Sequence, residues 1–419
     1  MHYGIITYGS RGDVQPYIAL ALGLMEKGHE VTLLANENFR EFVEGYGVGF
    51  FPLYGNIEAM VHSPELVAVL KSGNAIAYLR QMRNMMQKIQ SQVNVDMMQG
   101  AANADVLIAG PLTMAWVYSI AEKLDKKWAV VQLSVPAIPT KEFPFAGFAF
   151  FNAPWYNLFT YKLVRSIYWR INKKDINQYR VSLGLPLLMQ SILKNIDDQK
   201  ILQLYAISPS LIARPEDWDA TIDITGFLTI TGGKRKSQVT DQAPEGLVEW
   251  LKQGEAPIYI GFGSIPIPNP GLFADILVDM LTNTNHRFIF CMGWSDLPDL
   301  PTHSRLFVIK YVDHEWLFPQ CKTVITHGGI GTIAAALKAK IPPVIVSIFA
   351  DQPLWGKIIA DKNLGIHLPF KKLTKKKLLH AIATTQTFKI KQNASIIGER
   401  ISSEDGLQSA INALENYFK

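Results

Sequence analysis

The stretch TVITHGGIGT, residues 323–332, carries the clearest structural signal in the chain. Its first four residues are apolar or β-branched and predict a short buried strand. A glycine-rich turn follows and leads into a helix predicted over 333–340. Such a turn cradles an anion, because its backbone N–H groups and the helix dipole both favour negative charge. The stretch therefore predicts a phosphate site, and the missing Walker lysine argues against a triphosphate bound with magnesium.

The rest of the chain alternates strands with helices and is long enough for two domains. It has 419 residues, whereas a single hydrophobic core stops growing at roughly 250–300 residues. A first strand–helix–strand unit is predicted over 3–8, 14–27 and 30–35, and a second series begins with a strand at 257–262. Strands that alternate with helices pair in parallel. The predicted fold class is α/β, with two doubly wound domains whose strand ends face a shared cleft.

Composition narrows the class of protein and its partners. Hydrophobic residues make up 48% of the chain and charged residues 18%, which suits a packed globular protein. The formal net charge of +5 is too small to indicate a nucleic-acid partner. Cys291 and Cys321 lack metal-ligand spacing and are expected to be reduced thiols of a cytoplasmic protein. Prolines interrupt the uncharged run 143–161, so we interpret it as a loop and short helix, not a membrane span.

A second motif follows the strand predicted to end at Ser347. It is ADQPLWG, residues 350–356, and it places Asp351 beside Gln352. A carboxylate next to an amide suits the vicinal hydroxyls of a sugar, because one accepts hydrogen bonds and the other can also donate them. Both motifs follow parallel strands, so they are expected at the same edge of one sheet.

These motifs and their order resemble a known family. Residues 311–356 contain HEWLFP (314–319), HGGIGT (327–332) and DQP (351–353), and GSRGDVQP (9–16) stands near the amino terminus. Together they resemble the family 1 nucleotide-sugar glycosyltransferases, in particular the sterol glucosyltransferase and glycopeptide-antibiotic glycosyltransferase branch. The resemblance implies the GT-B architecture of two Rossmann-like domains. It implies an acceptor-binding domain over 1–231, a linker over 232–245, a nucleotide-sugar-binding domain over 246–395, and a helix over 396–419 packing back on the first domain.

The resemblance also implies roles for individual residues in binding the sugar donor. His327, the backbone around the glycines, Thr332 and Ser264 would hold the diphosphate, Tyr311 and Val312 would flank the base, and Asp351 and Gln352 would hold the hexose. The full set implied to bind the donor is Ser10, Gly12, Ser264, Tyr311, Val312, His327, Gly329, Gly331, Thr332, Asp351 and Gln352. Many plant relatives have a ribose-binding glutamate where this chain has Ala335, which leaves the choice between uridine and thymidine donors open.

Asp13 is the candidate general base. Many relatives place a catalytic histidine in a Gly-His-x-x-Pro pattern, and the corresponding word here is GDVQP, residues 12–16. An aspartate with an ordinary pKa of about 3.9 is a weak base, but burial under an apolar acceptor would raise its pKa. The alternative is that Asp13 only caps a helix beginning at Val14. The family implies no metal, and a single displacement that inverts the anomeric carbon.

The acceptor side is less specific. Aromatic residues crowd 143–159, and Phe143, Phe148 and Trp155 are the acceptor-binding candidates, with core packing as the alternative. The segment 162–180 carries six basic residues and one acidic residue among aromatics. Such a segment is either a solvated helix face or a membrane-surface helix, so a peripheral membrane contact stays open.

The resulting hypothesis is an inverting transferase that moves a hexose, most simply glucose from UDP-glucose, to a hydrophobic acceptor such as a sterol, terpenoid or flavonoid. One alternative is an enzyme that forms membrane glycolipids. Another is a protein of the same fold that binds a nucleotide sugar without catalysis. A dinucleotide oxidoreductase is disfavoured, because no G-x-G-x-x-G fingerprint follows the first strand.

Overall fold

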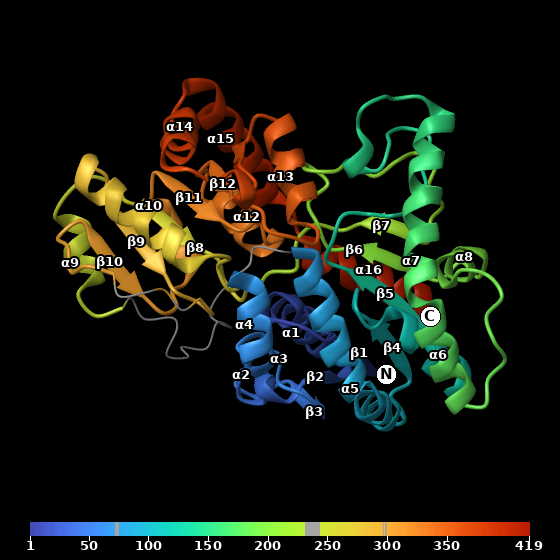
Figure 1. The fold of residues 1–419 in the computed structure, drawn as a ribbon. Coiled ribbons are helices and arrows are strands. Elements are labelled where there is room, and N and C mark those ends of the chain that lie inside the picture. The colour runs from blue at the N-terminus through green and yellow to red at the C-terminus, as the bar shows by residue number, and fades with distance from the viewer. Residues whose placement is uncertain (72–74, 231–243, 296, 298–299) are drawn as a thin grey trace. The chain divides into compact units, whose positions relative to one another are not determined.

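The computed structural model describes residues 1–71, 75–230, 244–295, 297 and 300–419. The chain forms two compact units, each built around one parallel sheet (Figure 1). The first unit consists of Met1–Ile57, Gln87–Lys234 and Glu404–Lys419, and the second of Glu58–Met86 and Arg235–Ser403. The predicted α/β class with two Rossmann-like domains is confirmed.

The first unit contains a seven-stranded sheet in the order β3-β2-β1-β4-β5-β6-β7, with every neighbouring pair parallel. Its strands are β1 (His2–Ile6), β2 (Glu30–Asn36), β3 (Gly49–Leu53), β4 (Val106–Ala109), β5 (Lys127–Gln132), β6 (Gln203–Tyr205) and β7 (Ile222–Ile224). The order reverses between β1 and β4, and ligands of such sheets bind beyond the carboxyl ends of the strands at that point.

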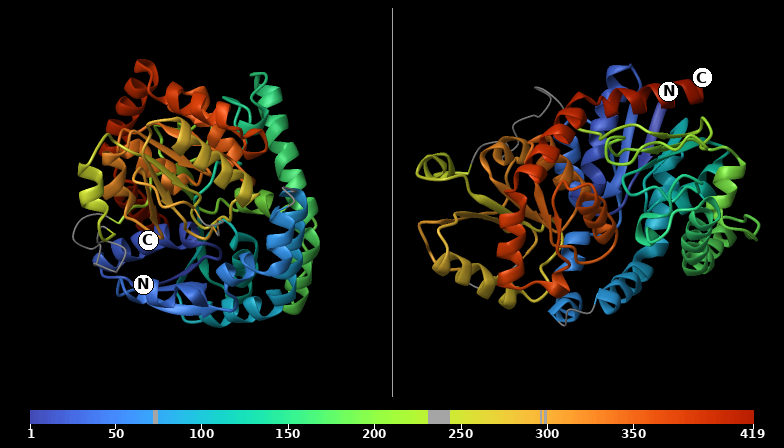
Figure 2. Two further views of the ribbon diagram at one scale, coloured as in Figure 1. Left: turned by 60° about the vertical axis from the view of Figure 1, so that its left-hand side comes forward. Right: turned by 90° about the horizontal axis from the view of Figure 1, so that it is seen from above.

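Helices cover the sheet of the first unit on both faces (Figure 2). They are α1 (Arg11–Glu26), α2 (Arg40–Glu44), α6 (Met114–Leu124), α7 (Pro154–Ser182), α8 (Ile192–Asp198) and α16 (Gly406–Phe418). The helix α5 (Ala75–Ala101) begins in the second unit and ends in the first. The core is a continuous cluster in which apolar residues of β1, β2 and β5 pack against α1 and α16.

The second unit contains a six-stranded parallel sheet in the order β10-β9-β8-β11-β12-β13. Its strands are β8 (Ile258–Gly261), β9 (Phe288–Cys291), β10 (Leu306–Ile309), β11 (Thr323–Thr326), β12 (Pro343–Ile345) and β13 (Ile366–His367). The order reverses between β8 and β11, so the loops that follow these two strands occupy the expected ligand position.

The second unit contains two groups of helices, from its segment Glu58–Met86 and from its segment Arg235–Ser403. They are α3 (Ile57–Val61), α4 (Pro64–Lys71), α9 (Leu247–Lys252), α10 (Pro270–Asn283), α11 (His314–Leu317), α12 (Ile330–Lys338), α13 (Gln352–Asp361), α14 (Lys375–Thr385) and α15 (Phe388–Ser403). The core between the sheet and α10 contains Phe262, Phe273 and Phe290, whose rings contact one another in a T-shaped and a tilted pair.

The carboxyl-terminal segment divides differently from the predicted boundaries of 246–395 and 396–419. The helix α15 stays with the second unit, and only α16, after Glu404, packs on the first unit against α1. Gly23 of α1 permits this contact, because a Cβ atom there would collide with Ile411. The two chain ends consequently lie near each other, with Tyr3 of β1 contacting the ring of Phe418.

The predicted domain over 1–231 also differs from the observed division, because Glu58–Met86 packs with the second unit. In this segment His62 Nε2 lies 2.9 Å from the carbonyl oxygen of Trp294, and the ring of Tyr78 lies 5.2 Å from that of Phe349. The predicted linker over 232–245 lies outside the described residues except for its last two positions. Among the described residues, no helix is long and apolar enough to cross a bilayer.

Candidate functional site

The loop after β11 forms the predicted cradle. Thr326 ends the strand, His327 follows it, and Gly329 is the N-cap of α12. The helix therefore begins at Ile330, three residues earlier than predicted, which brings Gly331 and Thr332 into its first turn. The first N–H groups of a helix have no partner within the helix and are available to an anion.

Glycine is required at two positions of this loop by the packing around it. Gly328 has a φ of +103°, and a Cβ atom there would lie 2.8 Å from Cγ2 of Ile345. A Cβ atom at Gly329 would lie 2.6 Å from Nε2 of His327. At Gly331, by contrast, a Cβ atom would meet nothing within 4 Å, so the backbone is open at this point of the first turn.

His327 is an uncharged imidazole at neutral pH. Its side chain is 8% exposed. Burial, with a smaller contribution from the electrostatic interaction with His314, lowers the pKa of His327 to about 4. A neutral ring carries one N–H donor and one acceptor nitrogen. The residue can therefore donate a hydrogen bond to a phosphate oxygen without titrating between pH 6 and 8.

The loop after β8 lies against the same histidine. Gly263 has a φ of +60°, and a Cβ atom there would lie 3.2 Å from Cε1 of His327. The carbonyl oxygen of Gly263 accepts a hydrogen bond of 2.9 Å from the N–H of Trp294. The half-buried Ser264 follows directly. Ser264 and His327 are thus brought to the reversal point between β8 and β11, as predicted from the sequence.

The Asp351–Gln352 pair lies at the start of α13, with Asp351 as N-cap and Gln352 as the first helical residue. Oε1 of the buried Gln352 accepts hydrogen bonds from the N–H groups of Ile348 at 2.8 Å and Phe349 at 3.2 Å. This oxygen is committed to holding the loop, so the NH₂ group is the part suited to a ligand. A Cβ atom at Gly328 would lie 3.3 Å from Cβ of Gln352, which shows that cradle and pair adjoin.

Trp355 orients the carboxylate of Asp351. The fully buried indole donates a hydrogen bond of 3.0 Å from Nε1 to Oδ2 of Asp351. Burial raises the pKa of Asp351, while the hydrogen bond from Trp355 lowers it and partly offsets that effect. Trp355 was not among the predicted site residues, although its spacing of four positions after Asp351 was visible in the sequence.

Tyr311 and Val312 follow β10 at the same edge of the sheet, and both are half-buried. Val312 packs against the cluster that contains Phe318 and Tyr259. The neighbouring His314 stacks on Phe318 with ring centroids 4.4 Å apart, and its Nε2 lies 3.1 Å from the hydroxyl of Tyr259. These contacts hold the segment HEWLFP, residues 314–319, against the core of the second unit.

In the first unit, Asp13 is the third residue of α1 and Ser10 is the N-cap. Oδ2 of Asp13 accepts hydrogen bonds from the backbone N–H of Ser10 at 2.8 Å and from its hydroxyl at 3.0 Å. The predicted helix start at Val14 is wrong, because the Ser10–Asp13 capping box begins the helix at Arg11. Asp13 therefore does help to cap the helix, from inside the first turn, and its carboxylate has a fixed orientation beyond β1.

Gly9 holds this turn in place. Its φ of +143° is rarely adopted by other residues, and a Cβ atom would collide with the carboxylate of Asp13. The N–H of Gly9 donates a hydrogen bond of 2.9 Å to Oδ1 of the buried Asn36. Gly12, in contrast, is exposed in the first turn of α1. A Cβ atom at Gly12 would lie 3.7 Å from Oγ of Ser10, which is an ordinary van der Waals distance.

The three predicted acceptor-binding residues have different surroundings. Phe143 and Phe148 are half-buried, whereas Trp155 is 69% exposed at the start of α7. The carbonyl of Phe148 accepts a hydrogen bond of 2.9 Å from the hydroxyl of Tyr156. Core packing is therefore wrong as the explanation for Trp155, and the aromatic segment is split between an inner and an outer set.

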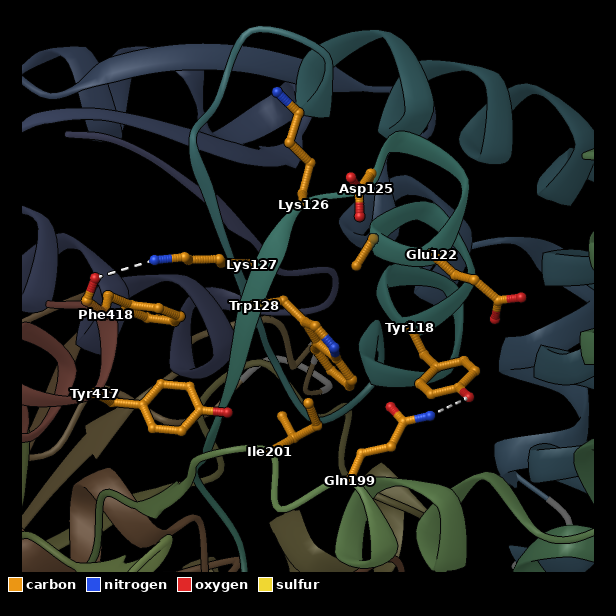
Figure 3. Close-up of a pocket in the computed structure, with 11 residues that line it drawn as sticks. Tyr118, Glu122, Asp125, Lys126, Lys127, Trp128, Gln199, Ile201, Tyr417 and Phe418 are labelled. Carbon is orange, nitrogen blue, oxygen red and sulfur yellow. Dashed lines mark hydrogen bonds between the residues drawn. The ribbon is translucent and has the colours of Figure 1, made fainter.

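A hollow of about 440 Å³ in the first unit lies away from these residues (Figure 3). It is lined by the end of α6, the start of β5 and the end of α16, where Lys127 donates to the carbonyl of Phe418 and Gln199 donates to the hydroxyl of Tyr118. Because Lys127 begins β5, the hollow lies at the amino ends of the strands, opposite to the edge at which such sheets bind ligands. We assign no site there.

No three His, Cys, Asp or Glu side chains of the described residues come together in a group that could hold a metal ion. Cys291 and Cys321 are both buried free thiols. Burial raises the pKa of Cys321 to about 12.

Two parallel-sheet Rossmann-like units, the second with a phosphate cradle and an adjoining Asp–Gln pair, define the class of GT-B glycosyltransferases. Residues 3–144 match the glycosyltransferase family 28 N-terminal domain, and residues 276–405 match the erythromycin biosynthesis protein CIII-like C-terminal domain. A solved structure with this fold is the Streptomyces sp. SF2575 glycosyltransferase SsfS6 complexed with thymidine diphosphate. It has a TM-score of 0.63 and 16% identity, and the match covers 99% of each chain.

Two sterol 3-beta-glucosyltransferases of Arabidopsis thaliana are similar over the whole chain. One is 34% identical, with 100% of this chain and 65% of the relative covered. The other is 31% identical, with 99% of this chain and 68% of the relative covered. The chain thus spans about two thirds of the length of these relatives. It belongs to the glycosyltransferase family that contains the sterol 3-beta-glucosyltransferases.

Gly9→Ala is expected to destabilise the first unit, because the new Cβ would displace the Asp13 carboxylate and strain a positive φ. The free energy of unfolding should fall by about 1–3 kcal/mol, measured by chemical denaturation. Gly12→Ala is the matched control, since it adds the same methyl group inside a helix without a collision and should leave stability unchanged or slightly higher. Equal effects of the two substitutions would contradict the role of Gly9.

Proposed function

We propose that the protein is a metal-independent, inverting glycosyltransferase that moves a hexose from a nucleoside diphosphate sugar to a hydroxyl of a hydrophobic acceptor. The observation that carries the proposal is the close approach of Gly328 to Gln352, where a Cβ atom added to the glycine would lie 3.3 Å from Cβ of Gln352, because it brings the phosphate cradle beside the Asp351–Gln352 pair at one edge of the second sheet. UDP-glucose and a sterol are the first candidate substrates, in keeping with the names of the Arabidopsis relatives.

The sugar donor would lie along the carboxyl edge of the second sheet. Its diphosphate would meet the N–H groups of Gly329 and Gly331, the hydroxyls of Ser264 and Thr332, and His327. Its base would lie against Tyr311 and Val312. The hexose would then reach the NH₂ group of Gln352 and the carboxylate of Asp351.

The same groups would stabilise the leaving diphosphate. As the bond from the anomeric carbon to the diphosphate oxygen breaks, negative charge develops on that oxygen. The amino end of α12 carries about half a positive charge, and fixed donors directed at developing charge are worth several kcal/mol in a site that excludes water. His327 would add a neutral N–H donor, so this assistance is expected to be constant from pH 6 to 8.

The acceptor hydroxyl would attack the anomeric carbon from the opposite side and transfer its proton to Asp13. One displacement inverts the configuration, so an α-linked donor would give a β-glycoside. General-base assistance of this kind is typically worth about 10²–10⁴-fold. The hydrogen bonds from Ser10 would hold the carboxylate in one orientation, and the aromatic segment with Phe143, Phe148 and Trp155 would contact the apolar body of the acceptor.

The test is product formation from defined substrates. UDP-glucose and dTDP-glucose are offered with a sterol, a flavonoid and a glycerolipid acceptor, and products are identified by mass spectrometry. We expect a sterol β-glucoside from UDP-glucose. Transfer to the glycerolipid alone would replace the sterol with a membrane lipid as acceptor. Donor binding without transfer or donor hydrolysis would identify a non-catalytic nucleotide-sugar-binding protein and overturn the proposal.

Asp13→Asn is expected to lower kcat by about 10²–10⁴-fold, because the amide cannot take the acceptor proton. The amide oxygen still accepts the hydrogen bonds from Ser10, so the fold of the turn and the affinity for the nucleotide should be retained. Steady-state kinetics and calorimetric titration with UDP measure the two effects. Asp105→Asn, at the amino end of β4, is the control. Unchanged kcat in Asp13→Asn would exclude Asp13 as the base.

Trp355→Phe is expected to move the acid limb of the pH profile of kcat/KM to higher pH. The pKa of Asp351 is already raised by burial, and loss of the hydrogen bond that lowers it raises this pKa further. The functional carboxylate is then lost earlier as the pH falls. Trp250→Phe removes a buried indole donor to the carbonyl of Ser304 and is the matched control. Identical acid limbs in the wild type and Trp355→Phe would show that Trp355 does not tune Asp351.

A further inference from the structure

The helix α7 divides its basic residues between two faces. Arg180 is buried and forms a two-pronged pair with Glu122, with N···O distances of 2.8 and 2.9 Å. Arg165 pairs with Asp197 at 2.6 Å. The other four basic residues of the helix, Lys162, Arg170, Lys173 and Lys174, are exposed. Two cations are thus used to fix the helix to the first unit, and four face outward.

Large apolar side chains are exposed on the same face. Along an α-helix, residues three, four or seven positions apart share a face. Trp155, Phe159 and Lys162 follow this spacing near the start of the helix, and Ile167, Arg170, Ile171, Lys174 and Val181 follow it farther along. Five apolar side chains of this helix are between 45% and 69% exposed, although positions this exposed to water are usually polar. They are Trp155, Phe159, Ile167, Ile171 and Val181.

The surface continues beyond both ends of this face. Before the helix, Phe150 is 85% exposed and Phe151 is 55% exposed. Near its carboxyl end a hollow of about 570 Å³ is lined by Arg170, Lys173 and Lys174 together with the apolar Val181 and Leu187. The helix has 29 residues, which corresponds to about 44 Å, and Figure 1 shows it as one unbroken helix on the outside of the first unit.

We propose that this outer face of α7, with Phe150 and Phe151, docks on the surface of an anionic phospholipid bilayer. Interfacial helices combine exposed aromatic and aliphatic residues, which enter the boundary between headgroups and acyl chains, with basic residues that meet lipid phosphates. The four outward cations match this chemistry, and the basic hollow is large enough for a phosphate headgroup. The only acidic residue of the helix is Asp175, so little negative charge opposes the contact.

Charge complementarity favours a bilayer over a folded partner. A protein partner that covered this surface would have to be acidic and apolar along about 44 Å, whereas an anionic bilayer presents both properties everywhere. Docking by this face would also place the exposed Trp155, an acceptor-binding candidate, at the lipid boundary. The inference goes beyond the proposed function and does not depend on it, because binding to vesicles requires no sugar transfer.

Vesicle binding tests the inference directly. The full chain is sedimented with phosphatidylcholine vesicles that contain or lack phosphatidylglycerol. We expect binding to the phosphatidylglycerol vesicles that weakens as salt is added, and much weaker binding to pure phosphatidylcholine. No binding to either vesicle, or equal binding to both, would overturn the proposal.

Matched variants separate the surface from net charge. Arg170→Gln/Lys173→Gln/Lys174→Gln should weaken binding by about 100-fold, because each basic residue near an anionic surface contributes about fivefold. The control Lys371→Gln/Lys376→Gln/Lys377→Gln removes three exposed charges from the second unit and should bind as the wild type does. Wild-type binding by the first variant, or an equal loss in the control, would refute the assignment.

A second variant tests the apolar half of the surface. Ile167→Gln/Ile171→Gln keeps good helix formers on α7 and every charge, and it should weaken binding by about tenfold or more while the salt dependence stays the same. Circular dichroism and the thermal midpoint establish that each variant is folded. An unchanged affinity in this variant would show that Ile167 and Ile171 do not enter the bilayer and would overturn docking by this face of α7.

Discussion

The close approach of four loop backbones at the carboxyl edge of the second sheet is the constraint from which the rest of the site follows. A side chain at Gly263, Gly328 or Gly329 would meet His327, Ile345 or Gln352, and one at Gly293 would collide with the carbonyl of Gly263. Only glycines let the loops after β8, β9, β11 and β12 converge in this way. Their convergence buries His327, lowers its pKa to about 4 and brings Gln352 beside the cradle. A charged imidazole would be costly in such a place, so backbone packing determines the chemistry of this residue.

The sequence predicted this region well because its information is local. The β-branched run at 323–326, the glycines and the Asp351–Gln352 pair each imply a structure within a few residues, and each is where it was expected. The predicted start of the first helix at Val14 was wrong because two nearby residues could each serve as its N-cap. Ser10 is the N-cap and forms a capping box with Asp13, so the helix begins at Arg11. The unit to which Glu58–Met86 and α15 belong depends on contacts distant in sequence, such as His62 with Trp294, and no local pattern encodes them.

Asp13 and Asp351 each make a structural hydrogen bond that would also orient the carboxylate for the role proposed for it. Each accepts hydrogen bonds through Oδ2, Asp13 from Ser10 and Asp351 from Trp355, and each lies in or next to the first turn of a helix. A hydrogen bond to one oxygen restricts the rotation of the carboxyl group, so less rotational freedom would be lost when the carboxylate binds a ligand. The choice between a cap and a base for Asp13 is therefore not exclusive, because the same contact that starts the helix also orients the group.

The outer face of α7 illustrates why composition alone could not distinguish a solvated helix from a membrane-surface helix. The net charge of +5 describes the whole chain, but exposed charges interact over about 8–10 Å at physiological salt, so local density is the relevant quantity. Only the structure shows that Arg165 and Arg180 are consumed by inward pairs while Arg170, Lys173 and Lys174 line one hollow. Two of the six basic residues of α7 are therefore paired within the fold. The remaining four are exposed, on the same helix as the exposed isoleucines and Val181. A merely solvated face gains nothing from those apolar neighbours, whereas an interfacial helix requires both kinds of residue on one face.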